Sequence, residues 1–122
     1  MKKSLWSLLL VMLFSLNILA APKIVKHELG QAQINGVPKR VVVFDYGLLD
    51  IVDAVGGNVV GVVKDNLPQS LKKFSDKKYT NIGTLFEPNY ETLIKLKPDL
   101  ILISGRQEKV YKELNKIAPT IY

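Results

Sequence analysis

Arg106 is the residue of this sequence whose type and position best suit a binding chemistry. It comes directly after Gly105, at the point where the apolar run of residues 99–103 gives way to polar residues. A guanidinium group presents its N–H donors as a planar fork that matches pairs of anionic oxygen atoms. Arg106 and Gly105 are therefore candidates for contacting an anionic ligand, although an exposed arginine at the start of a helix would give the same pattern.

Three other polar residues lie near predicted helix starts. Tyr46 could be a ligand-contacting aromatic residue or a packing residue at a helix N-terminus. Asp45 suits the N-cap of that helix better than acid–base catalysis, because no second carboxylate or general base accompanies it. Glu91 is expected to be exposed, on the helix face opposite Leu93 and Ile94. From position alone it is best explained as a carboxylate favoured by the helix dipole.

Cysteine and histidine usage excludes several kinds of site. The chain has no cysteine and one histidine, His27. Disulfides, Cys-based zinc sites, Fe–S clusters and a Cys nucleophile are excluded, as is any site built from two histidines of this chain. The sequence therefore predicts neither a metal site nor a catalytic centre. His27 is expected in an edge strand, away from the ligand site, in a structural or exposed role.

The charge distribution argues against nucleic acid as a partner. The formal net charge is +6, but the lysines are dispersed and the only arginines are Arg40 and Arg106. Base contacts are made most often by arginine, and a basic stretch is absent from the sequence. Neither GxGxxG nor GxxxxGK[ST] occurs, so a nucleotide site is not expected either.

Residues 1–20 have the layout of a secretory signal peptide. Met1, Lys2 and Lys3 form a short basic start, an apolar run covers residues 5–16, and Ala20 and Ala21 supply small residues for cleavage. Cleavage after Ala20 would lower the net charge from +6 to +4. The apolar run is shorter than the approximately 20 residues that a membrane-spanning helix needs. Because no cysteine follows it, the mature protein is expected to be free in a Gram-negative periplasm and not lipid-anchored.

The rest of the chain alternates between apolar strands and helical patterns. Strands are predicted at residues 24–29, 31–37, 40–44, 59–63, 79–82, 99–103 and 120–122, and helices at 46–55, 67–74, 88–97 and 106–117. Tyr90, Leu93, Ile94 and Leu96 are expected on the inner face of the third helix, which Pro88 should open. This alternation predicts an α/β fold with a mostly parallel sheet, in which ligands bind at the carboxyl ends of the strands. Since the chain stops within a strand, we expect the sequence to be a fragment.

Several segments together resemble the N-terminal lobe of periplasmic iron-siderophore substrate-binding proteins of ABC transporters. The segments are PKRVVV at 38–43, FDYGLLD at 44–50, VGV at 60–62, NIGT at 81–84, EPNYE at 87–91, LKPDLI at 96–101, ISGRQ at 103–107 and IAPT at 117–120. Their order and spacing span essentially the whole chain after the leader. The similarity is strongest to the catecholate subgroup, which includes enterobactin- and petrobactin-binding receptors.

The resemblance implies a fold, a ligand and a partner. It implies that residues 21–122 form one Rossmann-like lobe of a two-lobed class III binding protein, whose spine helix and C-lobe are absent here. Arg106 then matches an arginine that contacts the ferric catecholate, and Glu91 matches the acidic residue that pairs with arginines of the membrane permease. A non-enzymatic, monomeric receptor is implied, which holds a ferric siderophore as ligand and has no covalently bound cofactor.

Other functions remain open at this stage. A protein of the same fold could bind haem or cobalamin. An exported α/β enzyme is disfavoured because a nucleophile–base pair is not apparent, and a non-functional truncated remnant is a further alternative.

Overall fold

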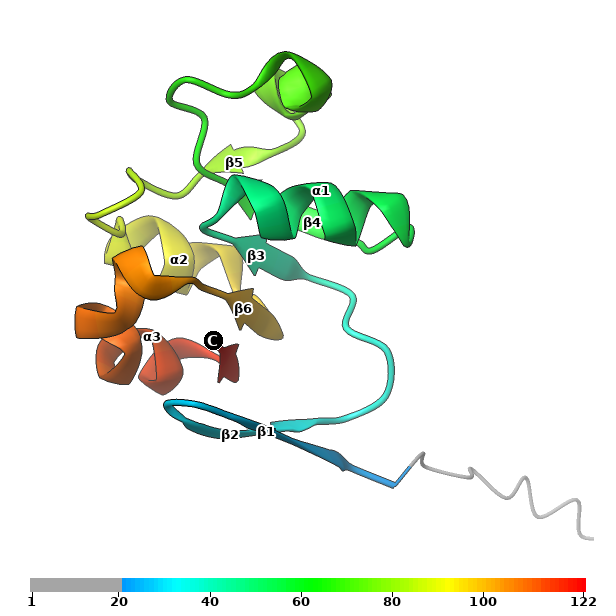
Figure 1. Ribbon diagram of the computed structural model, residues 1–122, viewed down its shortest axis with the longest axis vertical. Coiled ribbons are helices and arrows are strands. Elements are labelled where there is room, and N and C mark those ends of the chain that lie inside the picture. The colour runs from blue at the N-terminus through cyan, green and yellow to red at the C-terminus, as the bar shows by residue number, and fades with distance from the viewer. Residues whose placement is uncertain (1–20) are drawn as a thin grey trace, which may run out of the picture.

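The computed structural model describes residues 21–122, and the predicted signal peptide of residues 1–20 lies outside the described residues. The chain forms a hairpin followed by alternating strands and helices (Figure 1). The strands are β1 (Lys23–His27), β2 (Gly30–Ile34), β3 (Val41–Val43), β4 (Val59–Val62), β5 (Thr80–Asn81), β6 (Leu100–Leu102) and β7 (Thr120–Ile121). The helices are α1 (Tyr46–Ala54), η2 (Gln69–Ser75), α2 (Tyr90–Leu96), η3 (Gly105–Val110) and α3 (Tyr111–Ile117), where η marks a 3₁₀ helix. Within residues 21–122, the helices are too short or too polar to cross a membrane.

The main sheet confirms the predicted α/β fold. Its five strands run in the order β5-β4-β3-β6-β7, and all neighbours pair in parallel. β3 lies in the centre. From it the chain moves outward to β4 and β5, then returns to the other side of β3 and adds β6 and β7. The order of the strands therefore reverses between β3 and β6, which is where open α/β sheets bind ligands.

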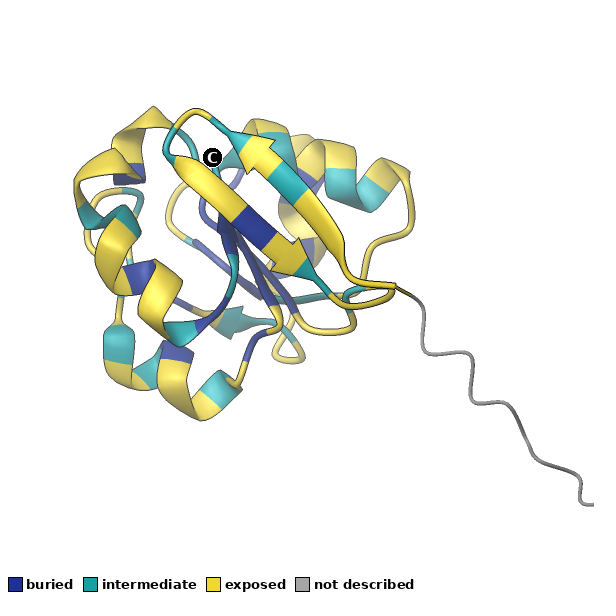
Figure 2. Ribbon diagram, turned by 90° about the horizontal axis from the view of Figure 1, so that it is seen from below, coloured by how far each residue is buried: buried dark blue, intermediate teal, exposed yellow. Residues whose placement is uncertain are grey.

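Alternate strand residues pack against helices on opposite faces of the sheet. Val42 and Ile101 belong to a buried cluster with Leu93 of α2 and Leu114 of α3. Val41 and Val43 belong to a second cluster, which contains Leu49 of α1 and the buried residues of η2. Since both faces are covered, the central strands lie among the buried residues (Figure 2). This explains their continuous β-branched sequence.

The hairpin β1–β2 packs beside the main sheet as a separate antiparallel pair (Figures 1 and 2). The ring of His27 meets the ring of Tyr111 edge to face, with 5.5 Å between centroids. A Cβ atom at Gly30 would lie 2.8 Å from the hydroxyl oxygen of Tyr111, so a side chain here would have to displace the end of the Tyr111 side chain. The start of α3 thus fixes the turn of the hairpin.

At the amino ends of β3 and β6, Arg40 and Asp99 connect the strands to α2. The Asp99 carboxylate accepts hydrogen bonds from the backbone N–H groups of Lys39, at 2.7 Å, and Arg40, at 2.8 Å. The Arg40 guanidinium donates to the carbonyls of Leu96 and Lys97 at the C-terminus of α2. These groups satisfy carbonyls that a helix end leaves without a partner.

Two predicted helices are 3₁₀ helices in whole or in part. In η2, Leu71 and Phe74 are buried three residues apart, a spacing that matches three residues per turn. The single helix predicted at 106–117 is divided into η3 and α3. In η3 the backbone hydrogen bonds span three residues, as from the Gln107 N–H to the Ser104 carbonyl at 3.0 Å.

The prediction for the start and inner face of α2 was wrong in two details. Pro88 does not open the helix: it pairs with Gly83 in an isolated bridge, and Asn89 caps the helix by accepting from the N–H of Thr92 at 2.9 Å. Ile94 is 60% exposed, whereas Leu93 is fully buried. In a helix of only seven residues the inward stripe is narrow, and Ile94 lies outside it.

We predict that Gly61→Ala destabilises the protein by about 1–3 kcal/mol, the usual cost of overpacking a core. A Cβ atom at this buried position would lie 2.7 Å from Ile82 Cγ2 and 2.8 Å from Leu96 Cδ2. Urea unfolding of the two proteins measures the difference. If the free energy of unfolding does not change, the side chains around Gly61 can rearrange to accommodate an added methyl group, and the prediction is wrong.

Candidate ligand-binding site

The segments that follow β3 and β6 lie side by side at the carboxyl edge of the sheet. The parallel ladder continues past the strands, because Phe44 N–H donates to the carbonyl of Leu102 at 3.0 Å. Asp45 therefore comes next to Ser104 and Gly105, although about sixty residues separate them in the sequence. This is the point at which the strand order reverses.

An open cavity of about 590 Å³ occupies this position. It is formed by the end of the hairpin, the start of α1, the segment after β6 and the last residue. The lining residues are Lys26, His27, Glu28, Asp45, Leu48, Ile103, Ser104, Gly105 and Tyr122. The lining includes Lys26, Glu28 and Asp45, so the cavity carries charges of both signs. For ligand binding, the orientation of individual donors and acceptors therefore matters as much as net charge.

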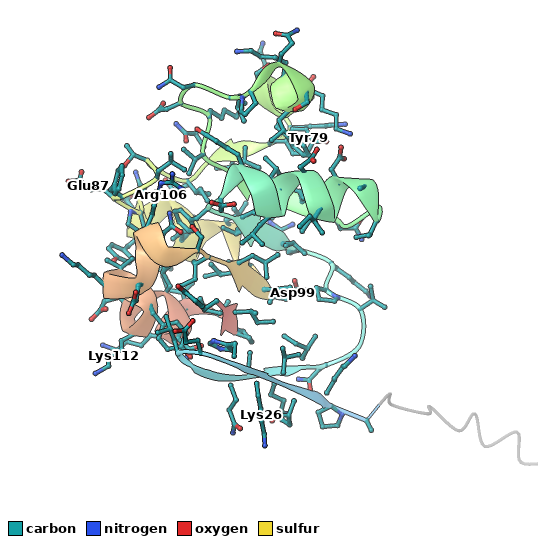
Figure 3. All side chains as sticks on the ribbon, in the orientation of Figure 1. Lys26, Tyr79, Glu87, Asp99, Arg106 and Lys112 are labelled. Atoms are coloured by element: carbon teal, nitrogen blue, oxygen red, sulfur yellow. The ribbon has the colours of Figure 1, made fainter. Side chains whose placement is uncertain are left out.

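Arg106 is not itself a lining residue of the cavity, but it follows Gly105 and pairs with Asp45, which both line it. Its Nη1 is 3.5 Å from Asp45 Oδ2, and its side chain is 53% exposed. The other carboxylate oxygen of Asp45 accepts from the N–H of Leu48 at 3.0 Å, which confirms Asp45 as the N-cap of α1. The Arg106 side chain, labelled in Figure 3, is thus about half exposed to solvent, with Nη1 directed at Asp45. An exposed pair of this length contributes little to stability, so a ligand anion can replace it.

Gly105 lines the same cavity, as its predicted role requires. A Cβ atom here would find its nearest neighbour, the Tyr122 hydroxyl oxygen, at 3.6 Å, which is an ordinary contact. Packing among residues 21–122 therefore does not demand glycine at this position. Its contact with a ligand stays a prediction.

Tyr46 occupies the first turn of α1 but is not among the residues that line the cavity. Its hydroxyl donates to the carbonyl of Asp65, and its ring packs against both buried clusters. Burial of the phenol, and secondly the nearby Asp65 carboxylate, raise the pKa of Tyr46. These contacts favour the packing alternative over ligand contact, which remains untested.

Glu91 is exposed in the first turn of α2, as predicted from the sequence. Its carboxylate lies 2.6 Å from the ammonium group of Lys95, one turn further along the helix. Glu91 lies on a different element from Arg106, and its predicted role in docking to a permease stays a prediction.

His27 was expected away from the ligand site, and this expectation was wrong. It lines the cavity, and its Nδ1 accepts from the backbone N–H of Tyr122 at 3.4 Å. Its Nε2 is buried without a partner among the described residues. No local pattern indicates this position of His27, because it depends on the hairpin packing against the end of β7. Residues 21–122 contain no cluster of three or more His, Cys, Asp or Glu side chains that could hold a metal ion.

Comparison with known proteins identifies the family. The family model described as "Periplasmic binding protein" matches residues 41–122, which include both edge segments of the site. The chain belongs to the periplasmic binding protein family. The family resemblance and the α/β lobe predicted from the sequence are thereby confirmed.

Individual members of the family support the assignment. The petrobactin-binding protein YclQ of Bacillus subtilis is 49% identical over 102 residues, which cover 80% of this chain and 32% of YclQ. Its crystal structure matches with a TM-score of 0.78 at 47% identity, over 83% of this chain and 37% of that one. The catecholate-siderophore binding protein VctP of Vibrio cholerae matches with a TM-score of 0.77 at 44% identity, over 82% and 36%. The Fe(3+)-citrate-binding protein YfmC of Bacillus subtilis is 43% identical over 102 residues, covering 81% and 32%.

The chain spans about a third of the length of the curated relatives that it matches. What the relatives bind according to their names is therefore support for a proposal about this chain.

We predict that Asp45 stabilises the fold through its cap and not through its ion pair. Asp45→Ala should lower the free energy of unfolding by about 1 kcal/mol, the usual cost of losing an N-cap. Asp45→Asn keeps an oxygen for the N–H of Leu48 and should be nearly neutral, because the pair with Arg106 is exposed. Urea unfolding of both variants checks this. If both variants lose the same free energy of unfolding, Asp45 stabilises the fold through its ion pair with Arg106 and not through the cap.

Proposed function

We propose that this chain forms the ligand-binding N-terminal lobe of an extracytoplasmic receptor for an ABC importer, and that its ligand is a ferric siderophore of the catecholate type. The observation that carries the proposal is the position of Arg106. It presents a guanidinium at the reversal point of the sheet, beside an open cavity. The names of YclQ and VctP add support, since each refers to a siderophore that the protein binds.

Capture requires charge complementarity and no bond-making. Ferric tris-catecholates are anions, so a guanidinium attracts them over long range and then donates hydrogen bonds to their oxygen atoms. On binding, the ligand oxygens replace Asp45 as acceptors for Arg106. The receptor thus acts as a binding protein and not as an enzyme.

The proposal places residues 21–122 as one lobe of a two-lobed receptor, with further ligand contacts on a second lobe. The coverage of about a third of each relative supports this domain assignment. The leader-like residues 1–20 support export to the periplasm. FecB of Escherichia coli is named as a periplasmic protein, whereas YhfQ and YfiY of Bacillus subtilis are named as lipoproteins. The sequence contains no cysteine to carry such an anchor, so a free, monomeric receptor is proposed.

Ferric citrate is a second candidate ligand. YfmC is named for Fe(3+)-citrate and FecB for Fe(3+) dicitrate. Citrate complexes of iron are also anionic, and the Arg106 fork suits a carboxylate as well as a catecholate. A comparison of the two complexes in one binding assay distinguishes them.

We predict that Arg106→Ala weakens binding of ferric enterobactin, used as the tris-catecholate probe, by about tenfold or more. The loss follows from removing a charged hydrogen-bond donor worth about 1.5–3 kcal/mol. Isothermal titration calorimetry of the exported protein measures the affinity, with ferric citrate titrated in parallel.

A matched control separates Arg106 from the general charge of the protein. Lys112→Ala removes one exposed positive charge on α3 that does not line the cavity and that Figure 3 shows apart from Arg106, and it should bind like the wild type. Binding that stays unchanged in Arg106→Ala, or falls equally in Lys112→Ala, would contradict the proposed role. Failure of the wild type to bind either iron complex would reject the proposed function itself.

Glu91 is proposed to dock the lobe onto the permease. Glu91→Lys should lower uptake of the radiolabelled ferric complex several-fold in cells and leave the calorimetric affinity unchanged. The fold should tolerate the change, because the pair between Glu91 and Lys95 is worth only about 0.3–0.5 kcal/mol. Asp50→Lys, a charge reversal at an exposed position of α1, is the control that should retain uptake. Equal uptake by the two variants would reject the docking role.

A further inference from the structure

Gln107 is a polar side chain buried in a segment that is otherwise exposed. Its side chain is inaccessible to solvent, whereas Arg106 before it and Glu108 after it are exposed. Apart from Gln107, only Thr120 is both polar and buried among residues 21–122. A buried amide destabilises a protein unless its donors and acceptor find partners, so its contacts deserve an explanation.

The amide of Gln107 connects two segments that the sheet keeps apart. Its Oε1 accepts from the backbone N–H of Ser104 at 2.9 Å, and its Nε2 donates to the carbonyl of Leu85. Ser104 follows β6, while Leu85 follows β5, and both β4 and β3 lie between those strands. Gln107 therefore ties the loop before α2 to the segment that carries Arg106.

The loop that Gln107 holds is itself rigidly folded. The hydroxyl of Thr84 accepts from the N–H groups of Phe86, at 3.3 Å, and Glu87, at 3.0 Å. The N–H of Thr84 in turn donates to the carbonyl of Glu87 at 3.0 Å. Figure 3 shows Glu87 and Arg106 at the same end of the molecule. Leu85 is thus a fixed point against which the start of η3 is held.

We propose that Gln107 is a positioning residue for Arg106. The backbone of Arg106 lies between Ser104 and Gln107, which are bonded to each other and, through Gln107, to Leu85. This arrangement fixes where the guanidinium emerges beside the cavity. Gln107 has no exposed atom with which to touch a ligand. The inference rests on the proposed function, in which Arg106 binds an anionic iron complex.

Removing the amide should therefore weaken binding only through Arg106. Gln107→Met keeps an unbranched side chain of similar length and removes both hydrogen bonds. We expect the affinity for ferric enterobactin to fall about threefold to tenfold, because Arg106 must then be ordered on binding. In the Arg106→Ala background, the same substitution should change the affinity by less than about twofold, since residues that act as a unit are not additive.

Two further variants complete the experiment. Thr120→Val removes the other buried polar group, whose hydroxyl donates to the carbonyl of Ala118, and should lower stability without changing the affinity. Thr84→Val loosens the loop from its exposed side, and replaces Gln107→Met if that variant does not fold. It should weaken binding in the wild-type background and have no effect in the Arg106→Ala background.

The possible outcomes separate this inference from the proposed function. Two results would overturn the positioning role alone. In the first, Gln107→Met lowers the affinity equally with and without Arg106. In the second, Gln107→Met binds like the wild type although Arg106→Ala binds weakly. If the wild type binds neither iron complex, the proposed function fails first, and if Arg106→Ala binds as well as the wild type, the proposed role of Arg106 fails first. A loss confined to the background that contains Arg106 is the result expected.

Discussion

The reversal of strand order beside β3 is the constraint on which the structure depends. Because β3 pairs with β4 on one side and β6 on the other, the segments that leave β3 and β6 diverge toward opposite faces of the sheet. Asp45 leads into α1 on one face, whereas Arg106 leads into η3 and α3 on the other. Among residues 21–122 no helix covers the gap between them, so polar side chains from both segments meet at an open cavity.

The site combines opposite charges, which bears on how it selects a ligand. Asp45 holds Arg106 at 3.5 Å and also caps α1, so the carboxylate is fixed whether or not a ligand is bound. A monovalent anion gains little by displacing it, because it offers the guanidinium no more charge than Asp45 does. A multivalent anion with several oxygen atoms gains more and tolerates the carboxylate nearby. For the proposed site, the pairing would thus favour large, highly charged complexes over common small anions.

Local sequence patterns were sufficient to predict most of the fold and part of the site. The β-branched runs within β3, β4 and β6 predict strands buried on both faces, and the rule for parallel sheets then places Gly105 and Arg106 at the carboxyl edge. His27 could not be placed, because its position depends on Tyr122, 95 residues away in the sequence. Gln107 was missed as well. In the sequence, a glutamine after an arginine resembles a surface residue, and its burial depends on the hydrogen bond to the carbonyl of Leu85, 22 residues away. Long-range contacts of this kind leave no periodic signal.

The two edges of the sheet are tied together by groups of different charge, and this difference suits the site. At the amino edge, charged Arg40 and Asp99 bind backbone groups, and no ligand is expected there. At the carboxyl edge the equivalent tie is the amide of Gln107, which satisfies a donor and an acceptor without carrying a charge. An acidic side chain at position 107 would repel the anion that Arg106 is proposed to bind, and a basic one would lack an acceptor for the N–H of Ser104. A neutral amide meets both requirements, and it leaves Arg106 and Asp45 to determine the local field.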